Sequence, residues 1–412
     1  MKTTAIVRYV LIALIVVVLS ALAGWYFFLK GESTTIAEGD IGRGVGLPQP
    51  FGEAIGSTYE NIVSSFSTLV GGIVRSGEEK PPQLAQVGKT PTAGYGFVGS
   101  GSSVRLRFVE RGAGYIFDVS PETGALKRVT NTLVPRTYEA LVAGDRVILR
   151  GIEEGGNITT VVGEITMSTS TRDAPAALKQ KRLVDNIRSI AIRPDGTEMF
   201  YIIDSLDGAA GIRASWDEKN QKKIFDSAVL GWQIDFLPDG RITVTENASD
   251  NAAGHTYLVR ENSLQPILGD VQGLTFLPHP KSSAYLYGAS SQGLSLFAQT
   301  ATTSTAVSLP IRTIADKCVW SEDSSLIVYC AVPQQLPPDP PAGGFLDAWY
   351  RGEVHTSDAW WHVNVSANSA EPLYSSANVV LDVEHPVIDE SGNYIAFRNA
   401  LDKSLWLLRV EE

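Results

Sequence analysis

SIAIRPDGTEMFYI (189–202) and QIDFLPDGRITVTE (233–246) repeat one pattern: a short apolar strand, a Pro-Asp-Gly turn and a second strand. Three further segments follow the same pattern: GLTFLPHPKSSAYLYG (273–288), KCVWSEDSSLIVYC (317–330) and HPVIDESGNYIAFR (385–398). The aligned turn positions are Asp195, Asp239, His279, Asp323 and Ser391. Pro, Asp, Gly and Ser are the residues that tight turns between strands favour. The repetition therefore predicts a series of β-hairpins.

The spacing of the repeats indicates how the hairpins are organised. Two less regular copies precede the five above, AGYGFVGSGSSVRLRFV (93–109) and YEALVAGDRVILRG (138–151). The turns recur about every 40–50 residues, apart from one longer copy, and this is the length of a four-stranded propeller blade. Seven copies over residues 84–412 predict an all-β domain, a seven-bladed β-propeller.

The two ends of the repeat region indicate how the ring closes. The last copy ends with SLWLLRVEE (404–412), which leaves no room for a fourth strand. Residues 84–87 have the pattern of an outer strand without a blade of its own. We expect this strand to pair with the C-terminal blade, because such closure removes the exposed edges of an open array.

Several motifs also point to a known family. The Arg-Pro-Asp-Gly and Leu-Pro-Asp-Gly hairpins, together with DVSPETGALKRVT (118–130), resemble the WD40-like "PD40" repeats of TolB-type bacterial propellers. The resemblance covers residues 84–412 and implies a propeller, but no single activity, because such propellers are scaffolds, binding modules and accessory domains of hydrolases. The whole chain is also similar to membrane-anchored propeller proteins of bacteria.

The N-terminal segment predicts a membrane anchor. Its uncharged run YVLIALIVVVLSALAGWYFFL (9–29) is long enough for one transmembrane helix. Lys2 and Arg8 precede the run and acidic residues follow it, so the positive-inside rule places the N-terminus in the cytoplasm. We expect residues 1–30 to form a cytoplasmic stub and a signal anchor in the cytoplasmic membrane, with a periplasmic or extracellular propeller. The alternative is a cleaved signal peptide, with a possible cleavage site after Ala23.

A tether is expected between the anchor and the propeller, at residues 31–83. Apolar residues between 53 and 75 recur at steps of three and four, which predicts an amphipathic juxtamembrane helix. We interpret this helix as packing on its own propeller. The alternative is a surface for self-association or for a partner beside the membrane.

Charge and motifs exclude several classes of function. The chain has 45 acidic and 34 basic side chains and a net charge of −11. Such a surface repels phosphate backbones, so we expect no nucleic-acid partner. There is no G-x-S-x-G, H-E-x-x-H or P-loop motif, and the sequence predicts no catalytic residue, cofactor or metal. His355, Asp358 and His362 lie close together, but their spacing matches no zinc motif, and we interpret them as solvated loop residues.

The only two cysteines, Cys318 and Cys330, lie on the two strands of one hairpin, symmetrically about Ser324. Strand partners in a hairpin have a constant index sum, so these residues should face each other. We expect a cross-strand disulfide if they form a non-hydrogen-bonded pair, and two buried thiols otherwise.

The long insertion at 331–359 is the best candidate for a binding site in the sequence. Trp, Tyr and Arg are the residue types that dominate interfaces. Such aromatic side chains can instead serve as local core, which is the alternative. The candidate binding residues are Trp349, Tyr350, Arg351, Trp360 and Trp361.

Three functions remain open. The leading hypothesis is a non-enzymatic scaffold of the cell envelope, whose propeller recognises a protein partner or a glycan. The second is a propeller-type hydrolase or lyase with its active site at the mouth of the central channel, where acids and histidines such as His279 and His385 would converge. The third is a structural subunit of a membrane-associated oligomeric surface assembly.

Overall fold

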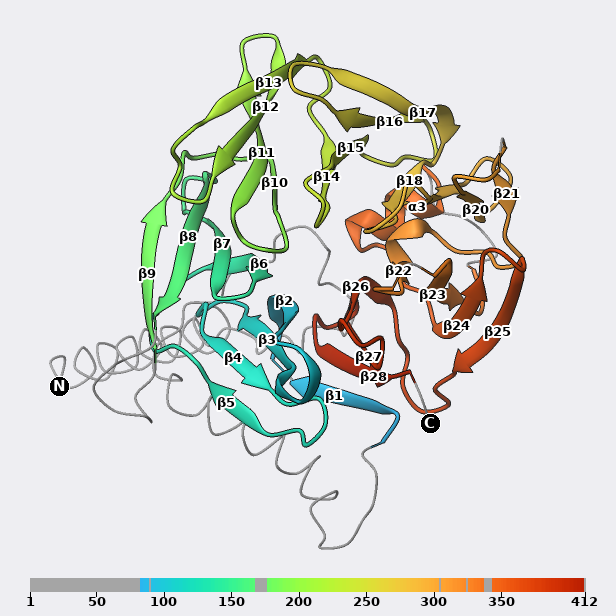
Figure 1. Cartoon of the computed structure of the whole chain (residues 1–412), viewed down its shortest axis with the longest axis horizontal. Coiled ribbons are helices and arrows are strands. Elements are labelled where there is room, and N and C mark those ends of the chain that lie inside the picture. The colour runs from blue at the N-terminus through green and yellow to red at the C-terminus, as the bar shows by residue number, and fades with distance from the viewer. Residues whose placement is uncertain are drawn as a thin grey trace, which may run out of the picture. The chain divides into compact units, whose positions relative to one another are not determined.

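The computed structural model describes residues 82–88, 90–166, 176–303, 305–323, 325–336 and 343–410. This part of the chain forms seven four-stranded antiparallel sheets, arranged as blades around a central channel (Figure 1). The prediction of an all-β, seven-bladed propeller is confirmed. The expected transmembrane helix and the expected helix at 53–75 lie outside the described residues. Within the ranges above, no helix is long and apolar enough to cross a membrane.

Blades 1 to 6 each use four consecutive strands, from the innermost to the outermost. Blades 1 to 3 contain β2 (Thr92–Val98), β3 (Arg105–Glu110), β4 (Ile116–Val119), β5 (Leu126–Arg128), β6 (Thr137–Ala143), β7 (Arg146–Ile152), β8 (Ile158–Thr166), β9 (Ala177–Arg182), β10 (Ser189–Ile192), β11 (Glu198–Ser205), β12 (Gly208–Ser215) and β13 (Lys222–Ser227).

Blades 4 to 6 repeat this arrangement, and blade 6 carries the long insertion. Their strands are β14 (Trp232–Phe236), β15 (Ile242–Glu246), β16 (Ala253–Val259), β17 (Leu264–Gln272), β18 (Thr275–Pro278), β19 (Tyr285–Ala289), β20 (Ser295–Gln299), β21 (Val307–Ser308), β22 (Cys318–Trp320), β23 (Ile327–Pro333), β24 (Asp358–Asn364) and β25 (Ser369–Tyr374). The described helices are the 3₁₀ turns η2 (Gly101–Ser103) and η3 (Ala315–Lys317) and the α-helix α3 (Phe345–Arg351).

Blade 7 joins the two ends of the propeller. It contains β26 (Val383–Ile388), β27 (Tyr394–Asn399) and β28 (Leu405–Arg409), and its fourth strand is β1 (Leu84–Gly88). Leu84 pairs with Leu408 and Gln86 with Trp406 in an antiparallel register. The strand expected at 84–87 therefore lies in the last blade, where it covers the edge that β28 would otherwise expose.

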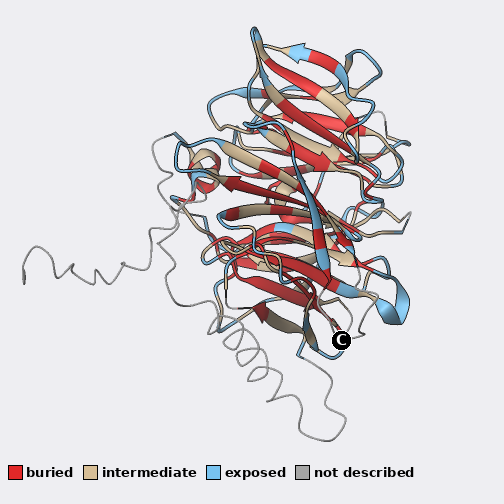
Figure 2. Ribbon diagram, turned by 90° about the vertical axis from the view of Figure 1, so that its left-hand side faces the viewer, coloured by how far each residue is buried: buried red, intermediate tan, exposed pale blue. Residues whose placement is uncertain are grey.

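The hydrophobic core lies between neighbouring blades. Buried residues follow the strands of each blade, while exposed residues gather in loops and on outer strands (Figure 2). Between blades 3 and 4, for example, Phe200 and Ile202 pack in one cluster with Trp232 and Val244. Each strand of a propeller sheet can bury both faces in this way, because each blade packs between two others.

Basic side chains link successive blades at the face that carries the innermost hairpin turns. At each of five joints, a cation donates a hydrogen bond to a backbone carbonyl in the next blade's turn. These bonds join Arg107 to Gly144 (2.7 Å), Arg146 to Gly196 (2.6 Å), Arg193 to Pro238 (3.1 Å), Arg241 to His279 (3.2 Å) and Lys281 to Glu322. Such charge-assisted bonds fix each blade relative to the next.

The two cysteines form a disulfide within blade 6. Cys318 of β22 pairs with Cys330 of β23, their Cα atoms are 4.1 Å apart, and the S–S distance is 2.10 Å. This short Cα distance is typical of a non-hydrogen-bonded antiparallel pair, as the expected disulfide required. Both residues are buried, so the bond reinforces the inner hairpin of the blade.

Candidate active site

A cavity of about 460 Å³ lies at one mouth of the central channel. It is lined by residues of the innermost strands β2, β6, β14 and β26, together with residues of η3 and α3. Because these elements belong to five different blades or their connections, the cavity lies on the channel axis. Most of its strand residues, such as Ala93 and Glu384, come from the N-terminal ends of their strands. The hairpin turns with the ring of basic residues are at the opposite ends of these strands.

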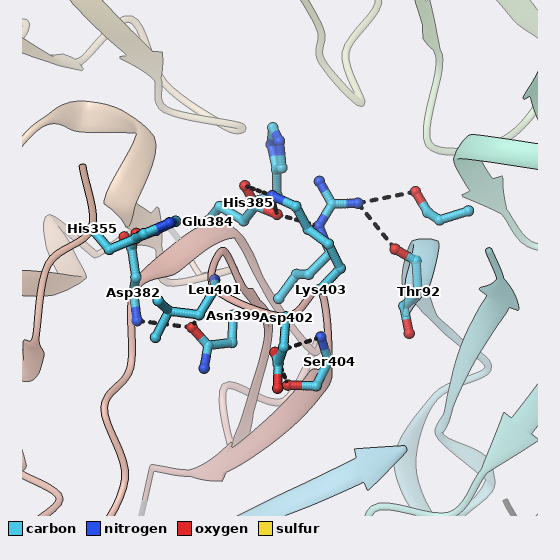
Figure 3. Close-up of polar contacts among 12 residues, drawn as sticks. Thr92, His355, Asp382, Glu384, His385, Asn399, Leu401, Asp402, Lys403 and Ser404 are labelled. Atoms are coloured by element: carbon cyan, nitrogen blue, oxygen red, sulfur yellow. Dashed lines mark hydrogen bonds and ion pairs between the residues drawn. The ribbon is translucent and has the colours of Figure 1, made fainter. Parts of the chain in front are cut away.

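The first wall of the cavity is formed by blades 7 and 1 and is rich in basic side chains. Arg398 and Lys403 both form ion pairs with Glu384, the latter at 3.1 Å. Arg398 also donates to the carbonyl oxygens of Thr92 and Ala93 in blade 1, at 3.2 Å each. Figure 3 shows Glu384, His385 and Lys403 gathered beside Thr92. These bonds fix the wall across the joint between the last and the first blade.

Arg111 adds a further cation to this wall. Within the described residues, its guanidinium donates no hydrogen bond and forms no ion pair. Burial and the nearby Arg398 guanidinium lower the pKa of Arg111, and the attraction of Glu384 and Tyr138 offsets only part of this effect. Tyr138 lies beside it, and burial raises the pKa of this phenol. A half-buried guanidinium that opens into a cavity is suited to bind an anionic group such as a carboxylate.

Two acids lie at or near the cavity: Asp316 belongs to its lining, and Asp235 lies on β14, which contributes Gln233 to the lining. Asp316 of η3 lines the cavity and accepts a hydrogen bond of 2.7 Å from the hydroxyl of Tyr350. Asp235 lies two residues beyond the lining residue Gln233 on β14, so both side chains leave the same side of the strand. Burial and, to a smaller extent, the negative charge of Asp316 raise the pKa of Asp235 to about 7, against the opposing effect of a 3.2 Å hydrogen bond from Thr243. Asp235 can therefore accept or donate a proton near neutral pH.

The helix α3 forms another wall of the cavity. It lies in the insertion between β23 and β24 and contributes Trp349 and Tyr350 to the cavity. Its start is fixed to the loop after β15, where the carboxylate of Asp250 accepts a bond of 2.6 Å from the amide of Leu346. Gly344 is required at this point, because its φ is +96° and a Cβ atom would lie 2.2 Å from that carboxylate.

The candidate binding residues from the sequence are divided between the core and the surface. Only Trp349 and Tyr350 line the cavity, and Trp349 is 1% exposed. Trp360 is fully buried against Phe397, and Trp361 packs at the edge of the core between blades 5 and 6. Arg351 is exposed and paired with Glu353 at 2.7 Å. Trp360 and Trp361 thus pack in or against the core, Trp349 and Tyr350 line the cavity, and binding by this insertion stays a prediction.

The interpretation of His355, Asp358 and His362 as solvated loop residues needs correction, because Asp358 and His362 lie on β24 and His355 is bonded to a buried carboxylate. Asp358 is not a solvated loop residue: it lies on β24 with a fully buried side chain, 2.5 Å from the ammonium of Lys317. His355 is bonded to Asp382 at 2.9 Å, while His362 packs near Tyr329. Alternation along the strand could not reveal the burial of Asp358, because its partner Lys317 lies some 40 residues away in the chain.

The two histidines expected to converge do not meet. His385 lines the cavity, where its φ is +51° and its carbonyl accepts a 2.6 Å hydrogen bond from the hydroxyl of Tyr95. His279 follows the far end of β18 and is buried beside Trp320, with a ring nitrogen 3.2 Å from the carbonyl of Ser325. The acidic and basic groups of the cavity replace the predicted pair.

A signal for Asp235 is present in the repeats. When the five hairpins are aligned, the third position of the inner strand holds Ala191, Asp235, Thr275, Val319 and Val387. Asp235 is the only acid in this column, and Val387 of the same column lines the cavity. Arg111 and Asp316 lie outside the inner strands, in connections between elements, and the repeat pattern carries no signal for them.

The comparisons with known proteins concern the fold. No protein-family model matches the chain, and neither does any curated protein. Among solved structures, the oligogalacturonate lyase of Vibrio parahaemolyticus is similar at 10% identity and a TM-score of 0.52, over 80% of this chain and 94% of that one. An oligogalacturonate lyase in complex with manganese is similar at 11% identity and a TM-score of 0.54, over 81% and 94%. TolB of Acinetobacter baumannii matches at 11% identity and a TM-score of 0.41, over 77% and 79%.

These findings correct the leading hypothesis from the sequence. A non-enzymatic scaffold for protein or glycan recognition is contradicted, because the solved structures that share this fold include enzymes, the two lyases. The comparison favours the alternative of a propeller hydrolase or lyase. The likeness itself establishes the fold, and any reaction has to be supported by the cavity of this chain.

A manganese ion does not fit the described residues. Within them, no group of three or more His, Cys, Asp or Glu side chains is placed to hold a metal ion. The buried carboxylates beside the cavity, Asp358 and Asp382, are both bonded to the ammonium of Lys317, which occupies the position between them. No step of the proposed reaction therefore involves a metal.

Proposed function

We propose that this chain is a propeller-type lyase that acts on a carboxylate-bearing sugar in the cavity at the channel mouth. The observations that carry this proposal are the Arg111 guanidinium in the lining of the cavity and the near-neutral acid Asp235 on β14, two residues from the lining residue Gln233. Strongly shifted pKa values concentrate at functional sites, and a guanidinium that donates no hydrogen bond to the described residues can bind an anionic ligand. The shared fold with oligogalacturonate lyases supplies the substrate class to be tested.

The groups of the cavity can perform a β-elimination. Arg111 binds the sugar carboxylate and stabilises the negative charge that develops on it when the adjacent C–H bond breaks. Asp235, in its ionised form, takes up this proton. The electron pair of the C–H bond forms a C=C bond, and the C–O bond to the neighbouring sugar breaks. Asp235 then returns the proton to the departing oxygen, so that proton and charge balance.

The test is a reaction with oligogalacturonides, followed by the ultraviolet absorbance of the C=C bond conjugated to the carboxylate. We expect the wild type to produce this absorbance. Its kcat/KM should rise with pH as Asp235 ionises and reach half of its maximum near pH 7. Arg111→Met should lower kcat/KM by about 100-fold or more, and Arg111→Lys should retain part of the activity.

Two outcomes would contradict the proposal. New reducing ends without the double bond would identify a hydrolase, which uses the same cavity for a different reaction. No product from any uronide tested, together with unchanged uronide binding by Arg111→Met, would exclude the cavity as the site of this reaction.

We also propose that residues 1–30 anchor the enzyme in the cytoplasmic membrane, with the propeller on the outer side. The uncharged run 9–29 and the basic residues before it support this location. Cell fractionation with protease accessibility tests it, since an intact propeller in protease-treated spheroplasts would contradict an outside location.

A further inference from the structure

The residues beneath α3 form a buried charged cluster that the proposed reaction does not use. It comprises Lys317, Thr356, Asp358 and Asp382, with His355 at its edge. We propose that Lys317 and Asp382 are positioning residues, which hold α3 at the channel mouth and thereby fix Tyr350 and Asp316 at the cavity. This inference rests on the proposed function in that the cavity is taken to be the active site.

Asp382 is the centre of the cluster and has no exposed side-chain surface. Its carboxylate accepts hydrogen bonds from Lys317 (2.7 Å), the indole N–H of Trp349 (2.9 Å) and the hydroxyl of Thr356 (3.0 Å), and it contacts Nδ1 of His355 at 2.9 Å. Figure 3 shows His355 next to Asp382, in the same blade as Glu384 of the cavity. The bond to Trp349 joins α3 directly to the start of blade 7.

Lys317 connects the cluster to the acidic wall of the cavity. Its ammonium lies 2.5 Å from Asp358 and 4.8 Å from the centre of the Trp349 ring, above which it forms a cation–π contact. The preceding residue in η3 is Asp316, which accepts the hydroxyl bond of Tyr350. Lys317 and Trp349 are thus bonded beneath the cavity, and their neighbours Asp316 and Tyr350 are bonded at its wall. Neither pair can shift without the other.

The charge of the cluster explains why it is rigid. Two fully buried carboxylates share one ammonium, and burial raises the pKa of Asp358. One oxygen of Asp358 has no hydrogen-bond partner among the described residues. Separating any member from Lys317 would leave a charge uncompensated in an environment without water, which is strongly unfavourable. The cluster therefore tolerates only one arrangement of η3 and α3.

The remaining contacts of α3 show why this anchor matters. The helix has only seven residues, too few to be stable by itself. Its start is held by blade 4, where the Asp250 amide donates to Asp347 at 2.7 Å and the Asp250 carboxylate accepts from Leu346. Its C-terminal half, which carries Trp349 and Tyr350, is held by Asp382. The bond from Trp349 decides whether Tyr350 stays at the cavity.

The experiment removes the indole hydrogen bond to Asp382 and keeps an aromatic ring at this position. In Trp349→Phe, we expect hydrogen–deuterium exchange of residues 345–351 to rise by about tenfold or more. Turnover of oligogalacturonide should fall about tenfold in kcat with KM changed less than about twofold, because displacement of Asp316 removes a charge that helps to raise the pKa of the proton acceptor Asp235, while Arg111 still binds the substrate.

Trp320→Phe is the matched control. It removes an indole hydrogen bond of 3.3 Å to the carbonyl of Leu277, from an equally buried ring at the far end of β22. We expect a similar loss of stability, with unchanged exchange at 345–351 and unchanged kcat. If both variants lower kcat equally, the effect of Trp349 is general destabilisation, and the positioning role is excluded.

The two proposals fail in distinguishable ways. If the wild type acts on no uronide, the proposed function fails, while the exchange of residues 345–351 still decides whether the cluster holds α3. Unchanged exchange in Trp349→Phe would overturn the inference even in an active enzyme. Raised exchange with unchanged kcat and KM would show that the cluster holds the helix but positions no group for the reaction.

Discussion

Asp235 is a residue whose environment opposes its charge. The carboxyl is partly buried, its pKa is raised by this burial to about 7, and its hydrogen bond comes from the neutral hydroxyl of Thr243. An ionised carboxylate in such a place destabilises the folded state. Proteins tolerate such a loss of stability at active sites, because the buried acid is needed there to transfer a proton.

Asp235→Asn tests this cost directly. Because the pKa of Asp235 is higher in the folded state than in the unfolded state, the folded protein retains a proton that the unfolded chain releases. The free energy of unfolding should therefore fall as pH rises from about 4 to about 7. The substitution removes this fall, so it should stabilise the protein by about 1 to 3 kcal/mol at pH 8 and have little effect at pH 4.

Chemical denaturation of both proteins at the two pH values measures the difference. An equal effect of the substitution at pH 4 and pH 8 would contradict a raised pKa. The same variant should lack the proposed lyase activity, since the amide cannot accept the proton.

The residue scale is also where the sequence was least informative. In the aligned hairpins, Asp235 stands out as the one acid at its position. Arg111 and Asp316, by contrast, come from connections of different length in different blades. A propeller site is assembled from positions far apart in the chain, so no local motif marks it. The sequence also did not indicate that Asp358 is buried. Its burial depends on an ion pair with Lys317, which is distant in the chain.

Among the elements, the inner hairpin of blade 6 combines two roles. Its strands β22 and β23 are joined by the disulfide, and β22 follows directly after η3, which carries Asp316 and Lys317. The sequence predicted the facing cysteines, because the symmetry of a hairpin fixes its cross-strand pairs. The sequence did not predict α3, because a segment of seven residues is too short to show a helical pattern of apolar residues within a long insertion.

Removing the disulfide should destabilise the propeller. The bond closes a loop with a sequence separation of 12, and chain entropy predicts a contribution of about 3 kcal/mol for a loop of this size. Cys318→Ala/Cys330→Ala, compared with the wild type by urea denaturation without reductant, should show this loss. Addition of reductant should weaken the wild type and leave the variant unchanged. Equal midpoints for the two oxidised proteins would contradict a stabilising role.

At the scale of the whole molecule, the fold was predictable because it repeats. Seven similar hairpins with turns at similar spacing allow few other architectures, and each copy supports the others. The closing strand was predictable for the same reason, since the last blade lacked a strand and residues 84–87 lacked a blade. What the repeats share is the framework, whereas the site lies where the copies differ.

Deletion of residues 82–88 should open the ring. The backbone pairing between β1 and β28 covers an edge strand that otherwise exposes unpaired amides and carbonyls, and Val87 is buried in the core between blades 7 and 1. We expect a fall of several degrees in the melting temperature, measured by calorimetry, and an increased tendency to aggregate. A melting temperature equal to that of the wild type would contradict closure by β1.

The position of β1 also determines how the propeller responds to mechanical force. The described chain enters the propeller through this strand, and four residue pairs join it to β28. A pull on the chain before Leu84 therefore loads these hydrogen bonds before those of any other strand pair. The first element to yield under tension is thus the outermost strand of blade 7, the one that closes the ring.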